Sequence, residues 1–234
     1  NAMGIESLDI GQLDLSAPVG AQLTAALRQC IIRNQLKPGV RLSEAEIGAR
    51  FGISRQPVRE AFIKLSEEGL LEIRPQRGSF VRKISLEAVM DARFVREAVE
   101  ADIVKACAAD PSSGLVEELR EQIRAQQRLV DDRPAAFVPL DDMFHRTLAQ
   151  AAGRPNAWAV IEGMKTQMDR VRQMTSINFP LAHLITQHNA VVDAIEARDP
   201  QAAEQAMRGH LQMILQDLPA IREGFPDYFD PSGA

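Results

Sequence analysis

Two side chains that could bind a metal or exchange a proton, Asp141 and His145, lie four residues apart in the segment DDMFHRTLAQ. At about 100° per helical residue, they point within about 40° of each other, whereas Asp142 lies about 100° from Asp141. The apolar arc beside the first two is formed by Leu140, Phe144, Leu148, Ala151 and Ala152. Asp141 and His145 are therefore predicted to face the interior together, and Asp142 to lie on the flank.

Two further histidines lie on the apolar faces of later helical segments. His188 lies among leucine, isoleucine and valine residues in LAHLITQHNAVVDAI, and His210 lies among alanine, methionine and isoleucine residues in AAEQAMRGHLQMI. His183 points to the opposite side of its helix. Three imidazoles and one carboxylate suit Zn, Ni, Fe or Mn. Spacing alone leaves a hydrogen-bonded interior cluster equally open, because distances between helices cannot be read from a sequence.

The same donor set could activate a metal-bound water for hydrolysis. No H-E-x-x-H pattern and no paired carboxylate accompanies it on those faces, so a general base is missing and no catalytic residue is assigned.

Arg96 is a cation on an apolar stripe, which it shares with Val89, Ala92, Val99, Ile103 and Cys107. A buried guanidinium requires an anion, and its planar fork suits a carboxylate. Two interpretations follow: an internal pair with Glu100, four residues on, or a grip on an organic acid shared with the metal. Arg93 and Arg172, at the edges of their apolar faces, are weaker candidates for the same acid.

The elements that must position these residues are helical. Breaks at Pro and Gly divide the second part of the chain into segments short enough to pack as neighbours in an antiparallel six-helix bundle. The predicted helices are 85–109, 112–131, 134–152, 155–177, 180–198 and 200–218.

The preceding residues have a different pattern, three short helices followed by two strands around the turn in LLEIRPQRGSFVRKI. That order is typical of a winged helix-turn-helix. In the helix that starts near Ser54, Arg55 and Arg59 share a face with Gln56 at its N-terminal end, where arginine suits guanine and glutamine suits adenine. The fold class predicted for the chain is therefore mainly α, a winged helix-turn-helix followed by the helical bundle.

The charge distribution agrees with two functions in one chain. Residues 18–84 hold 12 of the 27 Lys and Arg but only 6 of the 32 Asp and Glu, on a protein with a net charge of −5. A basic first part on an acidic protein indicates that this part meets a polyanion. The two cysteines, Cys30 and Cys107, read as buried thiols, and no run is apolar enough for a membrane span, so a cytoplasmic protein is expected.

The stretch PGVRLSEAEIGARFGISRQPVREAFIKLSEEGLLEIRPQRGSFV resembles the N-terminal domain of the GntR family of bacterial transcription regulators. Its SRQPVREA matches that family's SR-x-PVREAL pattern, and EEGLLEIRPQRGSFV matches the family's helix end and wing. The resemblance implies DNA contacts from Arg55, Gln56 and Arg59. It also implies a wing that reaches toward the minor groove, with Gln76, Arg77 and Gly78. Ala45 departs from members that carry a DNA-contacting arginine there, so the sequence preference is left open.

The helical half is similar to the FCD ligand-binding domain of the FadR subfamily of GntR regulators. Metal-binding members carry Asp-x3-His on one helix and single histidines on two later helices. The matching positions here are Asp141, His145, His188 and His210. The resemblance implies one divalent transition metal per chain, zinc or else nickel, manganese or iron. The number of predicted helices resembles the VanR-type branch more than the longer FadR branch.

These expectations combine into a ligand-responsive DNA-binding regulator, in the family's commoner mode a repressor. It would bind double-stranded operator DNA as a homodimer and respond to a small organic acid. The alternatives are a metal-dependent hydrolase fused to a DNA-binding domain, and an effector-independent regulator whose metal is purely structural. The predicted domains are 1–17, an extension with a tag remnant at Asn1 and Ala2; 18–84, the winged helix-turn-helix; 85–222, the effector-binding and dimerisation domain; and 223–234, a tail.

Overall fold

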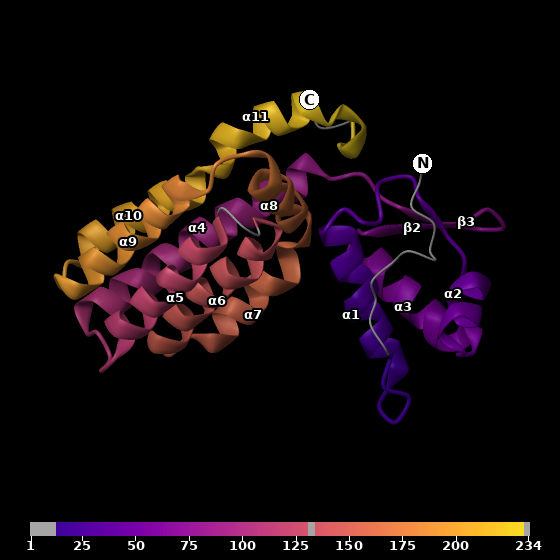
Figure 1. Ribbon diagram of the computed structural model, residues 1–234, viewed down its shortest axis with the longest axis horizontal. Coiled ribbons are helices and arrows are strands. Elements are labelled where there is room, and N and C mark those ends of the chain that lie inside the picture. The colour runs from indigo at the N-terminus through magenta and orange to yellow at the C-terminus, as the bar shows by residue number, and fades with distance from the viewer. Residues whose placement is uncertain (1–12, 131–133, 232–234) are drawn as a thin grey trace. The chain divides into compact units, whose positions relative to one another are not determined.

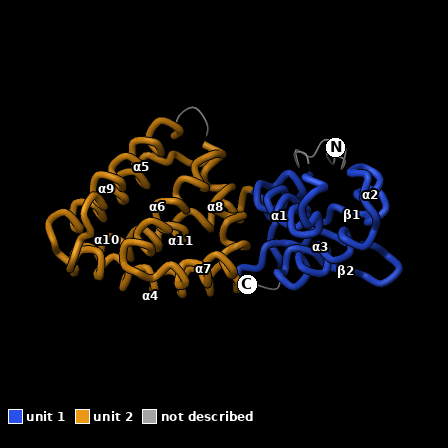
Figure 2. Tube along the Cα trace, turned by 90° about the horizontal axis from the view of Figure 1, so that it is seen from below, with its two compact units in different colours: residues 1–86, 225–234 blue, residues 87–224 orange. Residues whose placement is uncertain are grey.

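The computed structural model describes residues 13–130 and 134–231, and the predicted tag remnant lies outside these ranges. The chain divides into two compact units, of which the first comprises residues 1–86 and 225–234 and the second residues 87–224 (Figures 1 and 2). The first unit therefore takes its residues from both ends of the chain.

The first unit is a winged helix-turn-helix, as predicted. Its helices are α1 (Val19–Ile32), α2 (Glu44–Phe51) and α3 (Arg55–Glu67). Its antiparallel sheet has the order β1-β3-β2, from β1 (Arg41–Leu42), β2 (Leu71–Arg74) and β3 (Gly78–Val81). The hairpin of β2 and β3 was expected, whereas the two-residue strand β1 is too short to leave a pattern in the sequence. The core contains Leu23, Leu27, Ile47, Phe62, Leu65 and Val81.

Local sequence signals explain where these elements begin and end. The Ser43 side chain accepts a hydrogen bond from the Glu46 backbone N–H at the start of α2, and Gly52 ends that helix at a φ of 63°. In the wing, Gly78 has a φ of 107°, and a Cβ there would lie 2.7 Å from Nε of Arg41. Only glycine fits this turn without strain.

Residues 228–230 pair with the linker that follows the wing. Ile84 N–H donates to the Tyr228 carbonyl at 2.8 Å, and Asp230 N–H donates to the Ile84 carbonyl at 3.0 Å. The short 3-10 helix Pro226–Tyr228 leads into this bridge, and Phe229 and Ile84 are both buried. The segment predicted as an irregular tail is thus part of the first unit.

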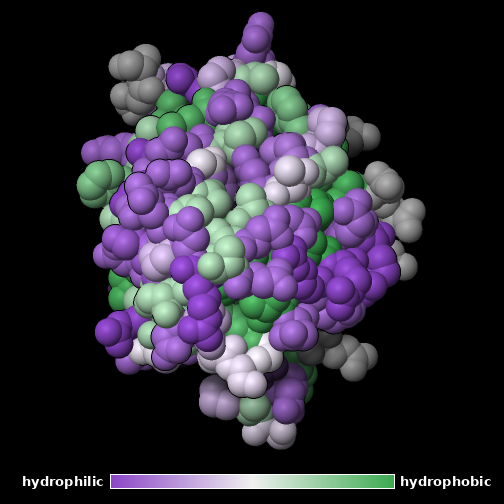
Figure 3. All heavy atoms as spheres, turned by 90° about the vertical axis from the view of Figure 1, so that its left-hand side faces the viewer, coloured by the Kyte–Doolittle hydropathy of each residue, from purple (hydrophilic) through white to green (hydrophobic). Residues whose placement is uncertain are grey.

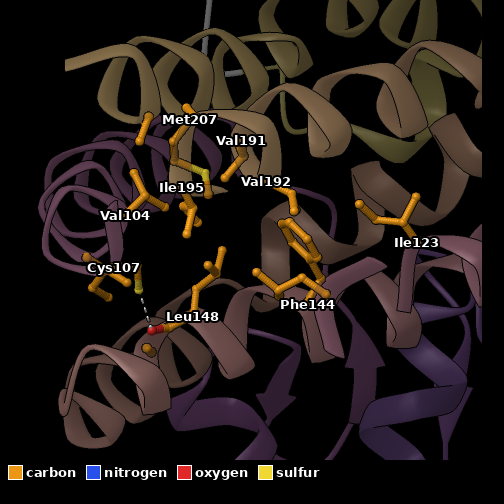
Figure 4. Close-up of a cluster of buried hydrophobic side chains, with 14 of the residues drawn as sticks. Val104, Cys107, Ile123, Phe144, Leu148, Val191, Val192, Ile195 and Met207 are labelled. Carbon is orange, nitrogen blue, oxygen red and sulfur yellow. Dashed lines mark hydrogen bonds between the residues drawn. The ribbon is translucent and has the colours of Figure 1, made fainter. Parts of the chain in front are cut away.

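The second unit is helical throughout its regular elements. They are α4 (Leu86–Ala109), α5 (Leu115–Val130), the 3-10 turn Pro134–Ala136, α6 (Phe137–Ala151), α7 (Pro155–Met164), α8 (Thr166–Asn178), α9 (Ala182–Glu196), α10 (Pro200–Gln212) and α11 (Ile214–Gly224). Figure 4 shows the core, in which Phe144 and Leu148 of α6 meet Val191 and Ile195 of α9. Cys107 is buried there, with its thiol 3.4 Å from the Leu148 carbonyl.

Two of the six predicted helices are each divided by a single residue. The segment predicted at 155–177 is interrupted at Lys165, whose side chain turns inward to Asp142 and Asp169, and Gly163 weakens the helix just before it. The segment predicted at 200–218 is interrupted at Met213, where the N–H bonds to the His210 carbonyl in the tighter i to i−3 pattern, and it continues to Gly224.

The surface of the helical unit is mixed rather than uniformly polar. Figure 3 shows hydrophilic residues on one face with apolar ones scattered among them. Within the described ranges, none of the helices combines the length and the apolar character that crossing a membrane requires.

Two glycine substitutions should have opposite effects on stability. Gly78→Ala should lower the free energy of unfolding by about 1–3 kcal/mol, because alanine is strained at its φ and meets Arg41. Gly163→Ala should raise it by up to about 1 kcal/mol, because Gly163 lies in α7 with open space around it. Denaturant unfolding followed by circular dichroism measures both, and a neutral Gly78→Ala would contradict the account of the wing.

Candidate metal and ligand site

The helical unit brings together the four candidate metal ligands. Asp141 and His145 lie on α6, His188 on α9 and His210 on α10, and all four are buried. One potential ligand atom from each lies within 4.8 Å of the others. The helix angles placed these residues on inward faces, and the packing of α9 against α5 and α10 supplies the convergence.

The three imidazoles present the same nitrogen to the centre of this cluster. The Nε2 atoms of His145 and His210 are 3.2 Å apart, and those of His188 and His210 are 3.3 Å apart. Asp141 adds its two oxygens, Oδ1 at 3.1 Å from Nε2 of His188 and Oδ2 at 3.6 Å from Nε2 of His145.

The opposite ring nitrogens are held by acceptors. Nδ1 of His188 lies 2.7 Å from Oε1 of Gln126, whose amide nitrogen donates to the Leu140 carbonyl and so fixes which end faces the ring. Nδ1 of His210 lies 3.0 Å from Oε1 of Gln187, and Nδ1 of His145 contacts Glu100. Each Nδ1 therefore carries the proton, and each Nε2 directs a lone pair inward.

Lone pairs at this distance repel one another unless a cation or a proton lies among them. Burial lowers the pKa of His188, and burial together with the neighbouring His188 and His145 lowers the pKa of His210 well below its usual value, so both rings are neutral near pH 7. Burial acts to raise the pKa of Asp141, but Arg172 and the histidines outweigh it and hold that pKa well below its usual range. Three imidazoles and one carboxylate fit a divalent transition metal.

Two residues that contact the outer ring nitrogens of the histidines, Gln126 and Gln187, were not among the residues predicted from the sequence. Gln126 follows Leu119 and Ile123 at helical spacing, and a polar residue on that buried stripe was an available signal. Gln187 stands next to His188 with no comparable pattern, so only the packing of α9 against α10 reveals it.

Arg96 forms the internal pair that was one of its two interpretations. Its Nε donates to Oε1 of Glu100 at 2.6 Å, and both residues are nearly inaccessible. Burial acts to raise the pKa of Glu100, but Arg96 and His145 outweigh it and lower that pKa to about 2. Nη2 of Arg96 has no hydrogen-bond partner among the described residues, which leaves part of the guanidinium for a ligand.

Arg172 joins the cluster directly through Asp141. Its Nη2 contacts Oδ2 of Asp141, and its Nη1 bonds Asp142 at 2.8 Å and Asp169 at 2.5 Å. Asp142 is half-buried beside the cluster, outside the group of potential metal ligands. Arg93 pairs with Glu97 on the same helix.

A cavity connects these groups. It is lined by Arg93, Arg96, Asp141, Arg172 and His210 together with Phe137, Val138, Met168, Thr175, Ser176, Leu181, Leu184, Leu211, Met213, Ile214 and Asp217. The centres of water-sized spheres can occupy about 70 Å³ of it, whereas one water needs about 10–15 Å³ by this measure. A small organic molecule therefore fits, with the three arginines, Asp141 and His210 on its walls.

The residues predicted to contact DNA lie on the first unit. Arg55, Gln56 and Arg59 are exposed at the start of α3, and Gln76 and Arg77 are exposed in the turn between β2 and β3, next to Gly78. Arg59 pairs with Glu44 at 3.1 Å and Gln56 with Glu60 at 2.9 Å. Exposed pairs of this kind are weak, so these side chains can exchange partners readily.

Comparisons with known proteins agree with both units. Residues 20–81 match the family of bacterial regulatory proteins described as gntR, and residues 91–213 match the FCD domain. The chain is 41% identical over 221 residues to the HTH-type transcriptional repressor RspR of Escherichia coli, covering 93% of this chain and 96% of that one. It is 31% identical to a probable D-xylose utilization operon transcriptional repressor of Paenarthrobacter nicotinovorans, covering 84% and 87%.

A solved structure has the same architecture. A GntR-type putative transcriptional regulator from Rhodococcus superposes with a TM-score of 0.71 at 26% identity, covering 86% of this chain and 98% of that one. The names of these relatives are those of transcriptional regulators, not of enzymes. The chain belongs to the GntR family of bacterial transcriptional regulators, and its helical part is an FCD domain.

Proposed function

We propose that this regulator is a repressor that senses a small organic acid through a metal-containing pocket in its helical unit. The observation that carries the proposal is the convergence of three Nε2 atoms on the Asp141 carboxylate, next to a cavity that Asp141, His210, Arg96 and Arg172 line. Cationic side chains on the wall of a small cavity favour an anion as its occupant.

Asp141, His145, His188 and His210 would hold one divalent metal, zinc or else nickel, manganese or iron. The metal would supply a positive charge and an open coordination position for a carboxylate. Arg96 would donate its free Nη2 to the same carboxylate, and Arg172 would face it beside Asp141. Arg93, a further cation of the cavity wall, would meet a second polar group of the acid.

On the DNA side, Arg55, Gln56 and Arg59 of α3 would reach base edges in the major groove, and the wing residues Gln76, Arg77 and Gly78 would approach the minor groove. Each copy of a homodimer would read one half-site of an operator. The acid would act by binding one conformation of the protein more tightly than another, which changes the population that is competent for DNA.

The metal assignment predicts one divalent ion per chain in protein purified without chelators. His188→Ala should reduce the metal content, because one of four ligands is lost, and removal of the metal by a chelator should lower the melting temperature. His183→Ala is the matched control, since His183 lies on the same helix outside the cluster. Elemental analysis showing no metal, together with no uptake of added zinc, would contradict the assignment.

The acid assignment predicts that Arg96→Gln weakens binding of the effector acid roughly tenfold to a hundredfold. This corresponds to the loss of one hydrogen bond to a charged group, which contributes about 1.5–3 kcal/mol to the binding free energy. Benzoate, succinate and gluconate, screened by thermal shift and then by calorimetry, cover three chemical classes of acid. Arg146→Gln is the control, because Arg146 is an exposed arginine paired with Glu162. If none of the acids changes the DNA affinity or the melting temperature of the protein, a regulator with a purely structural metal is favoured instead.

The DNA assignment predicts that Arg55→Ala and Arg59→Ala each weaken binding to a sequence selected from a random DNA pool by about 1–3 kcal/mol. Arg124→Ala, an exposed substitution in the helical unit, should leave the affinity unchanged. Fluorescence anisotropy at a fixed salt concentration measures all three. Equal affinity of the α3 variants and the unsubstituted protein would remove α3 from the DNA interface.

A further inference from the structure

Four charged side chains of the helical unit alternate in sign around a closed ring. Nζ of Lys165 bonds Oδ2 of Asp142 at 2.7 Å and Oδ2 of Asp169 at 2.6 Å. Nη1 of Arg172 bonds the other oxygens of the same carboxylates, Oδ1 of Asp142 at 2.8 Å and Oδ1 of Asp169 at 2.5 Å. We call Lys165, Asp142, Arg172 and Asp169 the charge ring.

The ring is buried and neutral. Lys165 and Asp169 are 3% and 6% exposed, and the side chains of Arg172 and Asp142 are 13% and 20% exposed. Two cations and two anions compensate one another, which lowers the cost of removing them from water. Lys165 occupies the single-residue break between α7 and α8, so the local backbone is shaped around this side chain.

The ring uses only one nitrogen of the Arg172 guanidinium. Nη1 takes both ring carboxylates, while Nη2 contacts Oδ2 of Asp141, one of the candidate metal ligands. A guanidinium is planar, so fixing Nη1 by two bonds fixes the direction of the Nη2 edge. That edge faces Asp141, and Arg172 lines the cavity.

Lys165 touches neither end of this arrangement. Among the described residues, it is outside the group that lines the cavity and outside the metal cluster. Its effect is to occupy the second oxygens of Asp142 and Asp169. Without it, Asp141, Asp142 and Asp169 would share one guanidinium, and the uncompensated pair of ring carboxylates would draw Arg172 away from Asp141.

We infer that Lys165 is a positioning residue for the ligand pocket, because by holding Asp142 and Asp169 it directs the Arg172 guanidinium toward Asp141 and toward a carboxylate in the cavity. This inference rests on the proposed acid-binding function. Stability alone is a weak reason for such a ring, since replacing buried ion pairs by apolar residues is often neutral or stabilising. Orientation of the Arg172 guanidinium is a functional reason for burying these four charges.

The first test measures the affinity of the full-length, zinc-loaded protein and its variants for acetate by calorimetry. Acetate serves as a small organic carboxylate. Lys165→Met should weaken acetate binding by about tenfold while the zinc content stays the same. Lys165→Arg, which keeps the charge, and the double variant Lys165→Met/Asp169→Asn, which restores the balance, should both recover most of the affinity. Lys105→Met is the matched control, because Lys105 pairs with Glu204 near the surface.

Recovery of acetate affinity in the double variant, with the zinc content unchanged throughout, attributes the loss in Lys165→Met to the uncompensated ring carboxylates. Unchanged acetate affinity in Lys165→Met, or a loss that neither rescue variant repairs, would overturn the inference. If the unsubstituted protein holds zinc but binds neither acetate nor benzoate, succinate or gluconate, the acid-binding proposal fails by itself, separately from the orientation of Arg172.

A second readout needs no ligand. In a crystal structure of Lys165→Met, the Arg172 guanidinium should turn toward Asp142 and Asp169 and lose its contact with Asp141, whereas the double variant should keep that contact. An Arg172–Asp141 contact preserved in Lys165→Met would overturn the positioning role, whatever the protein binds.

Discussion

Three imidazole nitrogens that direct lone pairs at one another across little more than 3 Å set the condition that the helical unit must satisfy. Positive charge at its centre would stabilise such an arrangement, and contacts on the far side of each ring hold the ring in place. Glu100, Gln126 and Gln187 hold those sides from α4, α5 and α9. The packing of the helices around this point is therefore fixed by polar contacts as well as by apolar burial.

Two chains of contacts lead outward from the cluster with the same chemical order. One runs from His145 through Glu100 to Arg96, and the other from His188 through Asp141 to Arg172. In each, a buried carboxylate is kept ionised between an imidazole and a guanidinium, and each arginine then lines the cavity. An anion entering the cavity would thus change the electrostatic environment of two histidines at once, although it touches neither ring.

The helical faces of Asp141, His145, His188 and His210 could be predicted from sequence, because the angle of a side chain around its own helix is a local property. The winged helix-turn-helix could be predicted too, from the order of its helices and from the SRQPVREA segment. Gln187 and the contact of Glu100 with His145 could not, because they depend on distances between helices. The break at Lys165 accompanies the burial of its ammonium group between Asp142 and Asp169. This is a tertiary effect, and no proline at the break marks it in the sequence.

The bridge between Ile84 and the Tyr228–Asp230 segment has a consequence for synthesis of the protein. The two partners are separated in sequence by the whole helical unit, so the DNA-binding unit cannot form this contact until residues 228–230 have been made. A chain released early would keep α3 and its arginines but would lack the strand-like segment that covers Ile84. This bridge therefore forms only after residues 87–224 of the helical unit have been made.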